Sequence, residues 1–323
     1  MPFSEEFLET AAREIESRYV VPDFERVREL IMNALKMCAA VEPSINLRNV
    51  DIYIHGSYAN KSNIYFPSNL EIMVEITTAK RFSPDEVSLE DNYFVDIPLE
   101  FGPREFRLLF ANALRDIVGD KLSEQAKTLR LSGLEKIKHD VDITPCMNFH
   151  FYKDNGSTGD RTRGILMYDS SIDRQIVSFP RQHNQNGFDK DQATGGNFKR
   201  MVRLFKTLHS LNVNEFYCIG PKVASGYFIE CLLYNVPDQL FFDASAPFRG
   251  DENGVAPQLL SAIFLKILNY LINADLEAFI CQNTVWRLMG TMAEFWTKER
   301  ADEFLAAIIR LHAAFPPSRT FLA

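Results

Sequence analysis

Residues 50–76 read VDIYIHGSYANKSNIYFPSNLEIMVEI, two apolar runs separated by a Gly-Ser turn and a polar stretch. Val50 to Ile54 alternates in polarity and is rich in β-branched residues, so it is a predicted strand, and the run from Leu70 to Ile76 is predicted as a second strand. The turn at Gly56 and Ser57 follows the first strand closely. Such a turn leaves backbone N–H groups and a hydroxyl available to phosphate oxygens. The stretch therefore predicts a strand, a phosphate-binding turn and a second strand.

Polar side chains at the second predicted strand indicate a metal site. Asn69 and Glu71 are two residues apart, so their side chains lie on the same face of the strand. Two neighbouring oxygen ligands suit Mg²⁺, which takes a few protein oxygens together with substrate phosphates. Asp142, on a later apolar strand, would complete the cluster, with Asp140 on the same face. The alternative is a surface loop with ordinary polar residues at the strand edges.

Periodicity in the remaining sequence separates a mixed region from a helical one. In the mixed region, helices are predicted over 7–37, with an interruption at Pro22, and over 106–131. A strand is predicted over 137–143, ended by Pro145, and a hairpin is predicted from 164–168 and 175–179. After a polar stretch from 181 to 197, only helices are predicted, over 198–211, 224–235, 257–272 and 297–315. The shift predicts a domain boundary near residue 182.

The composition is typical of a soluble globular protein, with 46% apolar and 24% charged residues among 323. No apolar run reaches the roughly 18 residues of a membrane span, and no secretory signal is visible. The five scattered cysteines favour a reducing cytosol over a disulfide framework. A net charge of −8 argues against constitutive binding of duplex nucleic acid, which usually needs a basic excess. We therefore expect a cytoplasmic protein with no membrane partner.

Several segments carry a family resemblance through their order and spacing. They are GSYANKSNI (56–64), VDITPC (141–146), FPRQH (179–183) with NG (186–187), ATGGNFKRMVR (193–203), SGYFIECL (225–232) with NVP (235–237), and WTKERA (296–301). The Gly-Ser turn, the two-apart polar pair and the later acidic strand are similar to the pattern of polymerase-β-like nucleotidyltransferases. All the segments together resemble the bacterial cGAS/DncV-like branch of that superfamily.

The resemblance implies a fold and an activity. The fold would be α/β, with a mixed-sheet nucleotidyltransferase core over residues 1–182 and a C-terminal helical domain over 183–323 that closes the nucleotide cleft. Three carboxylates on the sheet would face two Mg²⁺ or Mn²⁺ ions, one activating a ribose hydroxyl and one holding the triphosphate. The activity would be template-independent synthesis of a cyclic di- or oligonucleotide from NTPs. It would serve bacterial anti-phage signalling, through a downstream effector that responds to the product.

The resemblance also assigns nucleotide-binding roles residue by residue. Gly56 and Ser57 would form the turn that binds the terminal phosphates. Lys206 would reach the phosphates as a point charge, Ser225 would add a hydroxyl, and Tyr227 would stack on a base. A structural role stays open for two of these residues, Lys206 as a solvated helix position and Tyr227 as an aromatic residue of the core.

The metal-binding pair departs from the family pattern, which is Asp-x-Asp. Asn69 offers a neutral oxygen, so the cluster of Asn69, Glu71 and Asp142 carries two negative charges in place of three. Glu71 is one methylene longer than aspartate and must fold back to reach the same ion, which should lower metal affinity. Glu75 lies on the same face but about 13 Å farther along the strand, too far to share that ion.

Three functional hypotheses remain open on the sequence. The first is an active synthase of cyclic nucleotides. The second is a nucleotide-binding pseudoenzyme that keeps the cleft but has lost the chemistry through the altered metal pair. The third is a structural or nucleic-acid-sensing module, which the negative net charge and the lack of a tract rich in Lys and Arg disfavour.

Overall fold

The computed structural model describes residues 3–15, 19–64, 69–82, 94–95, 99–152, 161–216, 219–242, 259–290 and 296–315. The chain divides into two compact units. The sheet unit comprises Glu16–Ala59 and Ser68–Gln182, and the helical unit comprises Met1–Ile15, Asn60–Pro67 and His183–Ala323. Each unit has a hydrophobic core of its own.

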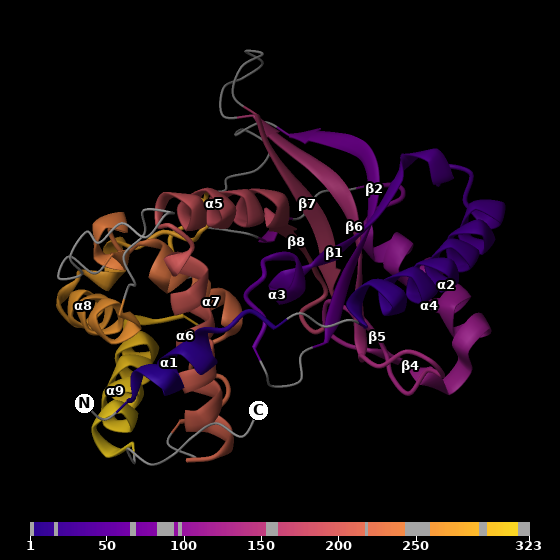
Figure 1. The fold of residues 1–323 in the computed structure, drawn as a ribbon. Coiled ribbons are helices and arrows are strands. Elements are labelled where there is room, and N and C mark those ends of the chain that lie inside the picture. The colour runs from indigo at the N-terminus through magenta and orange to yellow at the C-terminus, as the bar shows by residue number, and fades with distance from the viewer. Residues whose placement is uncertain are drawn as a thin grey trace, which may run out of the picture. The chain divides into compact units, whose positions relative to one another are not determined.

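A mixed β-sheet forms the centre of the sheet unit (Figure 1). Its strands among the described residues are β1 Val50–His55, β2 Leu70–Phe82, β3 Phe94–Val95, β4 Leu122–Glu124, β5 Leu129–Leu131, β6 Val141–Tyr152, β7 Arg161–Asp169 and β8 Arg174–Ser178. They follow the order β1-β2-β6-β7-β8-β3, with β5 also pairing β6 and β4 pairing β5. β2 and β6 run parallel, and the other pairs are antiparallel. The predicted strands at 50–54 and 70–76 and the hairpin of 164–168 with 175–179 are confirmed.

Strand β6 differs from the prediction for 137–143. It begins at Val141 and continues through Pro145, which was expected to end it. On the side of β6 away from β2, β5 pairs residues 141–143 and β7 pairs residues 146–152. Pro145, which has no N–H to donate, lies where one neighbouring strand ends and the next begins, so the sheet accommodates it.

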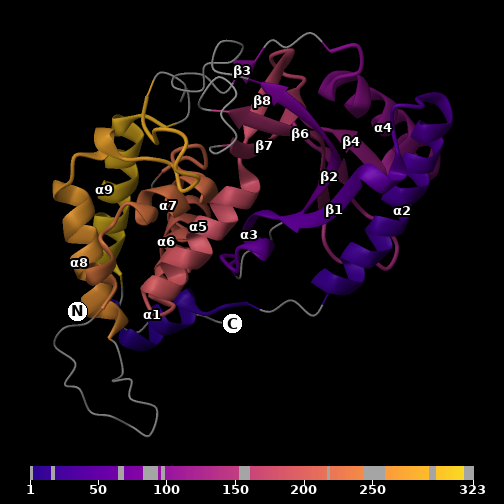
Figure 2. The same ribbon diagram turned by 90° about the horizontal axis from the view of Figure 1, so that it is seen from above.

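Two helices, α2 Val20–Val41 and α4 Pro103–Val118, lie side by side over one face of the sheet (Figures 1 and 2). The core between helices and strands includes Ile31, Ile72 and Phe110, none of which is accessible to solvent. A short helix, α3 Gly56–Ala59, follows β1, and single 3₁₀ turns span Leu47–Asn49 and Gly119–Lys121. The opposite face of the sheet carries Glu71 and Asp142 together with a smaller apolar cluster that includes Met73, Cys146 and Ile165.

The helix predicted over 106–131 is correct only in its first half. α4 ends at Val118, because Gly119 follows with a φ of 60°, outside the helical region. The remaining residues form the hairpin of β4 and β5, and β5 joins the sheet beside β6. Leu129 and Leu131 are buried and two residues apart, which is the period of a strand.

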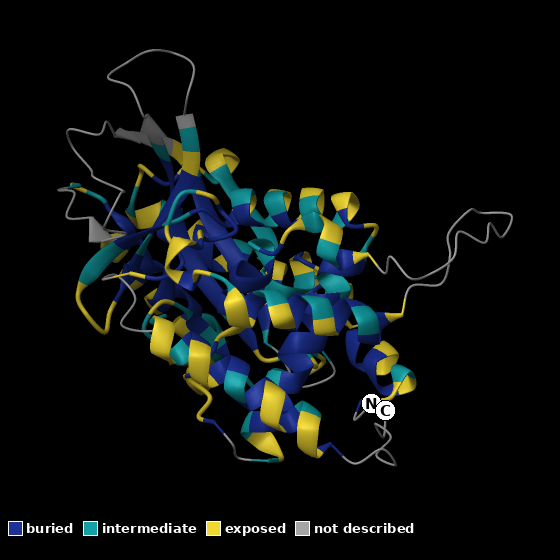
Figure 3. Cartoon of the chain, turned by 90° about the vertical axis from the view of Figure 1, so that its left-hand side faces the viewer, coloured by how far each residue is buried: buried dark blue, intermediate teal, exposed yellow. Residues whose placement is uncertain are grey.

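The helical unit consists of helices packed around an aromatic core. Its described helices are α1 Glu5–Ala12, α5 Pro180–Ala193, α6 Asn197–Asn214, α7 Gly226–Tyr234, α8 Leu260–Asn273 and α9 Lys298–Ala314, with 3₁₀ turns at Asp238–Phe241 and Leu276–Ala278; the first three residues of α5 lie in the sheet unit. Figure 3 shows buried residues on the inward faces of these helices and exposed residues outside. The four predicted helices after residue 197 are present, and the polar stretch from 181 forms α5. Across the described residues, we find no helix with both the length and the apolar character needed to cross a membrane.

The N-terminal segment packs with the helical unit, although the sequence prediction grouped it with the core at 1–182. The apolar side of α1 is buried there, including Phe7. The guanidinium of Arg203 on α6 donates to the carbonyl oxygens of Ala12 at 2.7 Å and Lys61 at 2.6 Å. One buried arginine therefore holds both the N-terminal segment and the segment after α3.

Candidate active site

Two carboxylates, Glu71 and Asp142, lie at the start of the parallel strands β2 and β6. They are register partners, so both side chains project from the same face of the sheet. Asn69, just before β2, donates a hydrogen bond from Nδ2 to Oδ2 of Asp142 at 2.8 Å. Asp140 is exposed, and its carbonyl oxygen accepts from the N–H of Leu70. The structure thus brings Asn69, Glu71 and Asp142 together on adjacent strands.

Arg130 on β5 is a member of this cluster that the sequence interpretation missed. It lies opposite Asp142 in the antiparallel pair of β5 and β6. Its Nε donates to Oδ1 of Asp142 at 2.8 Å, and a terminal nitrogen donates to Oδ2 at 2.9 Å. Burial acts to raise the pKa of the Asp142 carboxyl, but the hydrogen bonds from Arg130 and Asn69 outweigh it and hold that pKa below its usual range. Asp142 is therefore a stable carboxylate. The sequence analysis did not predict Arg130 as a site residue, because it assigned residues 106–131 to a helix.

Gly56 makes room for the longer side chain of Glu71. Its φ of 66° lies in the left-handed region, where glycine is favoured. A Cβ built on Gly56 would lie 1.3 Å from Oε2 of Glu71, so the carboxylate occupies the space that a side chain would take. The Glu71 carboxylate lies against the turn. Ser57, the next residue, is half-buried in α3.

The donor set of this cluster fits a divalent cation with a preference for oxygen. Two carboxylates on neighbouring strands, with an amide beside them, offer the hard oxygens that Mg²⁺ takes. The positive charge of Arg130 and the neutral amide of Asn69 both reduce the attraction for a cation. Within the described part of the chain, no group of three or more His, Cys, Asp or Glu side chains could hold a metal ion. The site therefore relies on fewer carboxylates than the three that the resemblance implies.

A second polar cluster surrounds Glu75, farther along the same face of β2. Glu75 is fully buried and accepts from Asn148 at 3.1 Å, Arg163 at 2.7 Å and Arg181 at 3.1 Å. The hydroxyl of Tyr53 also donates to it, at 2.9 Å. These contacts neutralise the buried charge, so Glu75 has a structural role, in agreement with its predicted exclusion from the metal site.

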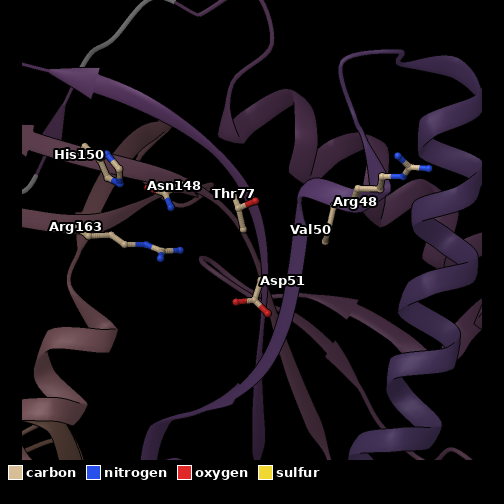
Figure 4. Close-up of a pocket in the computed structure, with 7 residues that line it drawn as sticks. All are labelled: Arg48, Val50, Asp51, Thr77, Asn148, His150 and Arg163. Atoms are coloured by element: carbon tan, nitrogen blue, oxygen red, sulfur yellow. The ribbon is translucent and has the colours of Figure 1, made fainter.

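An open polar pocket of about 520 Å³ adjoins this second cluster (Figure 4). It is lined by Arg48, Val50, Asp51, Thr77, Asn148, His150 and Arg163. In Figure 4, Asn148 and Arg163 extend toward Asp51 and Thr77, whereas Arg48 points away. The Oδ1 atom of Asn148 is buried without a hydrogen-bond partner. This pocket could not be predicted from the sequence, since its residues come from four strands and from the 3₁₀ turn that holds Arg48.

Lys206, the predicted phosphate ligand, is buried in the helical unit, so the solvated-position alternative is wrong. Its Nζ contacts Oε1 of Glu230 at 2.5 Å and the hydroxyl and carbonyl oxygens of Ser62 at 3.0 and 3.3 Å. Glu230 also accepts from Asn60 at 3.0 Å and contacts Nε2 of His183 at 2.7 Å. Burial acts to raise the pKa of Glu230, but Lys206 and His183 outweigh it and keep the pKa far below its usual range. All three donors of the ammonium are thus in use.

Ser225 and Tyr227 lie at the start of α7, close to Lys206. A Cβ added to Gly226 would come within 3.2 Å of Cε of Lys206. The hydroxyl oxygen of Ser225 accepts from the N–H of Phe228 at 3.1 Å, so it caps the helix. The ring of Tyr227 stacks on His183 and on Trp296, with centroids 4.8 and 5.4 Å apart. Both residues therefore have structural contacts in addition to their predicted roles.

Comparison with known proteins identifies the family. The model of the cGAS/DncV-like nucleotidyltransferase C-terminal helical domain matches residues 185–312. The cyclic UMP-AMP synthase of Rhodothermus marinus is 30% identical over 258 residues, which cover 79% of this chain and 82% of that protein. The cyclic dipurine nucleotide synthase of Elizabethkingia meningoseptica is 29% identical over 201 residues, 61% of this chain and 66% of that protein.

Two solved structures match this chain over almost its whole length. The R. marinus CdnE c-UMP-AMP synthase with Apcpp and Upnpp has a TM-score of 0.74 at 25% identity and covers 99% of this chain and 100% of that one. The E. meningoseptica CdnE cyclic dinucleotide synthase with GTP and Apcpp shares the fold, with a TM-score of 0.68 at 24% identity over 95% of this chain and 98% of that one. The chain therefore belongs to the cGAS/DncV-like nucleotidyltransferases, an enzyme family with an α/β core and a C-terminal helical domain.

Proposed function

We propose that this chain joins NTPs without a template into a cyclic di- or oligonucleotide. The product would be a cytoplasmic signal in bacterial anti-phage defence, sensed by a downstream effector. The synthase activity is supported by the family and by relatives named cyclic nucleotide synthases. The role in defence rests on the family resemblance alone.

The observation that carries the proposal is the pairing of Glu71 with Asp142 across the parallel strands β2 and β6. Their carboxylates would hold a divalent cation, Mg²⁺ or Mn²⁺, through hard oxygen ligands. Asn69 orients Asp142 through its hydrogen bond and keeps one amide oxygen as a third ligand. When bound, the cation supplies positive charge that lowers the pKa of the attacking ribose hydroxyl and stabilises the leaving pyrophosphate.

Residues outside the cluster would bind the phosphates and the base. Ser57 would donate its hydroxyl to a phosphate oxygen, beside a turn that Gly56 leaves open. Lys206 would add positive charge, but only by giving up one of its bonds to Ser62 or Glu230. Tyr227 would offer its ring to a base. The names of the relatives differ in the bases that they mention, so the bases used by this chain are left to a product assay.

A nucleotide-binding pseudoenzyme is the second candidate, favoured by one observation. Arg130 and Asn69 already satisfy the carboxylate of Asp142, as expected of a site that has lost its metal. Incubation with all four labelled NTPs and Mg²⁺ or Mn²⁺, followed by separation of products, distinguishes the candidates. A synthase gives a phosphatase-resistant cyclic product, whereas a pseudoenzyme gives none with either metal. A pseudoenzyme could gain activity only when Asn69→Asp is combined with Glu71→Asp.

A further inference from the structure

A buried carboxylate in the first turn of α2 holds the segment that leads into strand β6. The side chain of Asp23 is inaccessible to solvent. Its Oδ2 atom accepts hydrogen bonds from the backbone N–H groups of Lys138 at 2.8 Å and His139 at 3.1 Å. Because β6 begins at Val141, these bonds fix the chain just before the strand that carries Asp142.

The same carboxylate orients the ring of His139. Nδ1 of His139 lies 2.8 Å from Oδ2 of Asp23. Burial acts to raise the pKa of the Asp23 carboxyl, but hydrogen bonds from the His139 ring and from the backbone N–H groups outweigh it and hold that pKa below its usual range. Asp23 is therefore ionised and can only accept, so Nδ1 carries the proton in this contact. A charge-assisted hydrogen bond thus fixes the orientation of the ring.

The oriented ring contacts Tyr58, the residue that follows Ser57 in α3. The ring centroids of Tyr58 and His139 lie 5.4 Å apart at an interplanar angle of 79°, which is an edge-to-face pair. Tyr58 also packs against the core between the helices and the sheet. α3 is a single turn, Gly56–Ala59, and one helical turn is marginal on its own, so side-chain contacts must hold it in place.

The backbone of the same segment also reaches β2. The carbonyl oxygen of Asp140 accepts from the N–H of Leu70 at 2.9 Å. Leu70 stands between the two polar residues of the candidate metal pair. The segment 138–140, which Asp23 holds, therefore contacts the start of β2, precedes the start of β6 and reaches α3 through the ring of His139.

We propose that His139, held by Asp23, is a positioning residue that sets the place of the phosphate-binding turn through its ring contact with Tyr58. The inference rests on the proposed synthase function, to which it adds a residue outside the predicted metal-binding and phosphate-binding sets. His139 acts on Ser57 through the neighbouring ring of Tyr58. Because a misplacement of about 1 Å can cost an active site about a hundredfold, a small shift of Ser57 should weaken binding of the triphosphate.

The test is a double-mutant cycle on the full chain, with KM and kcat of product formation measured for the NTPs that the parent uses. His139→Asn removes the ring, while the new Nδ2 can still donate to Asp23. Tyr58→Leu removes the other ring and keeps an apolar side chain against the core. Each change should raise KM about tenfold and alter kcat less than about threefold, the pattern of lost binding. The double variant should also show a rise of about tenfold, because both changes break the same contact.

His312→Asn is the matched control, because His312 makes a comparable edge contact with Phe3 in the helical unit, with centroids 4.9 Å apart. Its KM should equal that of the parent. A rise of about a hundredfold in the double variant would mean that His139 and Tyr58 act independently, which would overturn the inference. An unchanged KM in a folded His139→Asn would overturn it as well.

Hydrogen exchange of the backbone N–H groups of residues 56–59, measured by mass spectrometry without nucleotide, gives a readout that does not depend on activity. His139→Asn and Tyr58→Leu should each speed this exchange at least about fivefold, and His312→Asn should leave it unchanged. Equal exchange in the parent and the two variants would overturn the inference, and Tyr58→Leu decides it if His139→Asn does not fold. If the parent binds no NTP and forms no product, the proposed function fails, while the exchange rates still decide the role of His139.

Discussion

The amide of Asn69 points its Nδ2 at Oδ2 of Asp142, 2.8 Å away, at the position where the family pattern has a carboxylate. The amide is oriented by this contact, since only a donor can face the charged oxygen. In the parent, Asn69 therefore stabilises Asp142 without a metal. An aspartate at this position would place two like charges in contact unless a cation lay between them.

Asn69→Asp should make the stability of the protein depend on metal. In EDTA, we expect the free energy of unfolding to fall by about 2 kcal/mol, through the loss of a charge-assisted hydrogen bond and the added repulsion. Added Mg²⁺ should restore much of this loss, and synthase activity should be intact or higher. Denaturant unfolding with and without Mg²⁺ measures the effect. Asn33→Asp, at an exposed position on α2, is the control and should show no dependence on metal.

Gly56→Ala should displace the carboxylate of Glu71. The new Cβ would overlap Oε2 of Glu71. Because Glu71 is exposed, we expect its side chain to move aside and the protein to stay folded. The stability cost should be about 1 kcal/mol, from the left-handed backbone, whereas product formation should fall at least about tenfold. Gly133→Ala is the matched control, because Gly133 has a φ of 65° and no neighbour within 4 Å of an added Cβ. Equal activity in the two variants would show that the position of Glu71 is unimportant.

Lys206→Ala should destabilise the helical unit before it affects nucleotide binding. The substitution leaves the buried carboxylate of Glu230 without its lysine partner. Breaking a buried pair in this way lowers the free energy of unfolding by about 3–5 kcal/mol. The double variant Lys206→Met with Glu230→Gln should recover part of this loss, because no buried charge remains. The comparison is Lys298→Ala, whose exposed pair with Asp302 should contribute less than about 1 kcal/mol. NTP binding measured on the double variant, with Glu230→Gln as its control, then reports the effect of losing the ammonium without leaving a buried charge unpaired.

His209 should make the helical unit sensitive to mild acid. Burial lowers the pKa of His209 to about 4, and its Nε2 is buried without a partner. Between pH 6.5 and pH 4, His209 takes up a proton in the unfolded chain but not in the folded one. The stability that depends on neutral His209 is therefore complete above pH 6.5 and declines as the pH falls. We expect a loss of about 2 kcal/mol between pH 7 and pH 5 in the parent. In denaturant titrations over the same pH range, the free energy of unfolding of His209→Leu should fall distinctly less than that of the parent. Equal losses would contradict the lowered pKa of His209.

The sequence predicted the parts of the fold that depend on local patterns. The strands at β1 and β2 and the hairpin of β7 and β8 follow from alternation, and α6 follows from its helical spacing. The error at 106–131 arose because short strands have too few residues to show a period. The extension of β6 through Pro145 depends on which strands pair beside it, and pairing is not local information.

The sequence predicts which side chains form the candidate site, but not the contacts that they make with their neighbours. The Gly-Ser turn, the two-apart pair of Asn69 and Glu71, and Asp142 on a later apolar strand could all be read from the sequence. Arg130 could not be found, because its contact depends on the register of β5 against β6. Glu230 was missed for a similar reason, since its partners come from segments as distant as Ser62 and Lys206.

Product formation by Asp142→Asn tests the central claim most directly. The parent, Asp142→Asn and the control Asp140→Asn, which alters an exposed acid two residues away, are incubated with labelled NTPs and Mg²⁺. If Glu71 and Asp142 hold the cation, the parent and the control form the cyclic product, and Asp142→Asn forms at least about a hundredfold less. An active parent whose turnover is unchanged by Asp142→Asn would contradict the account, because the reaction would then proceed without the carboxylate on which the site depends.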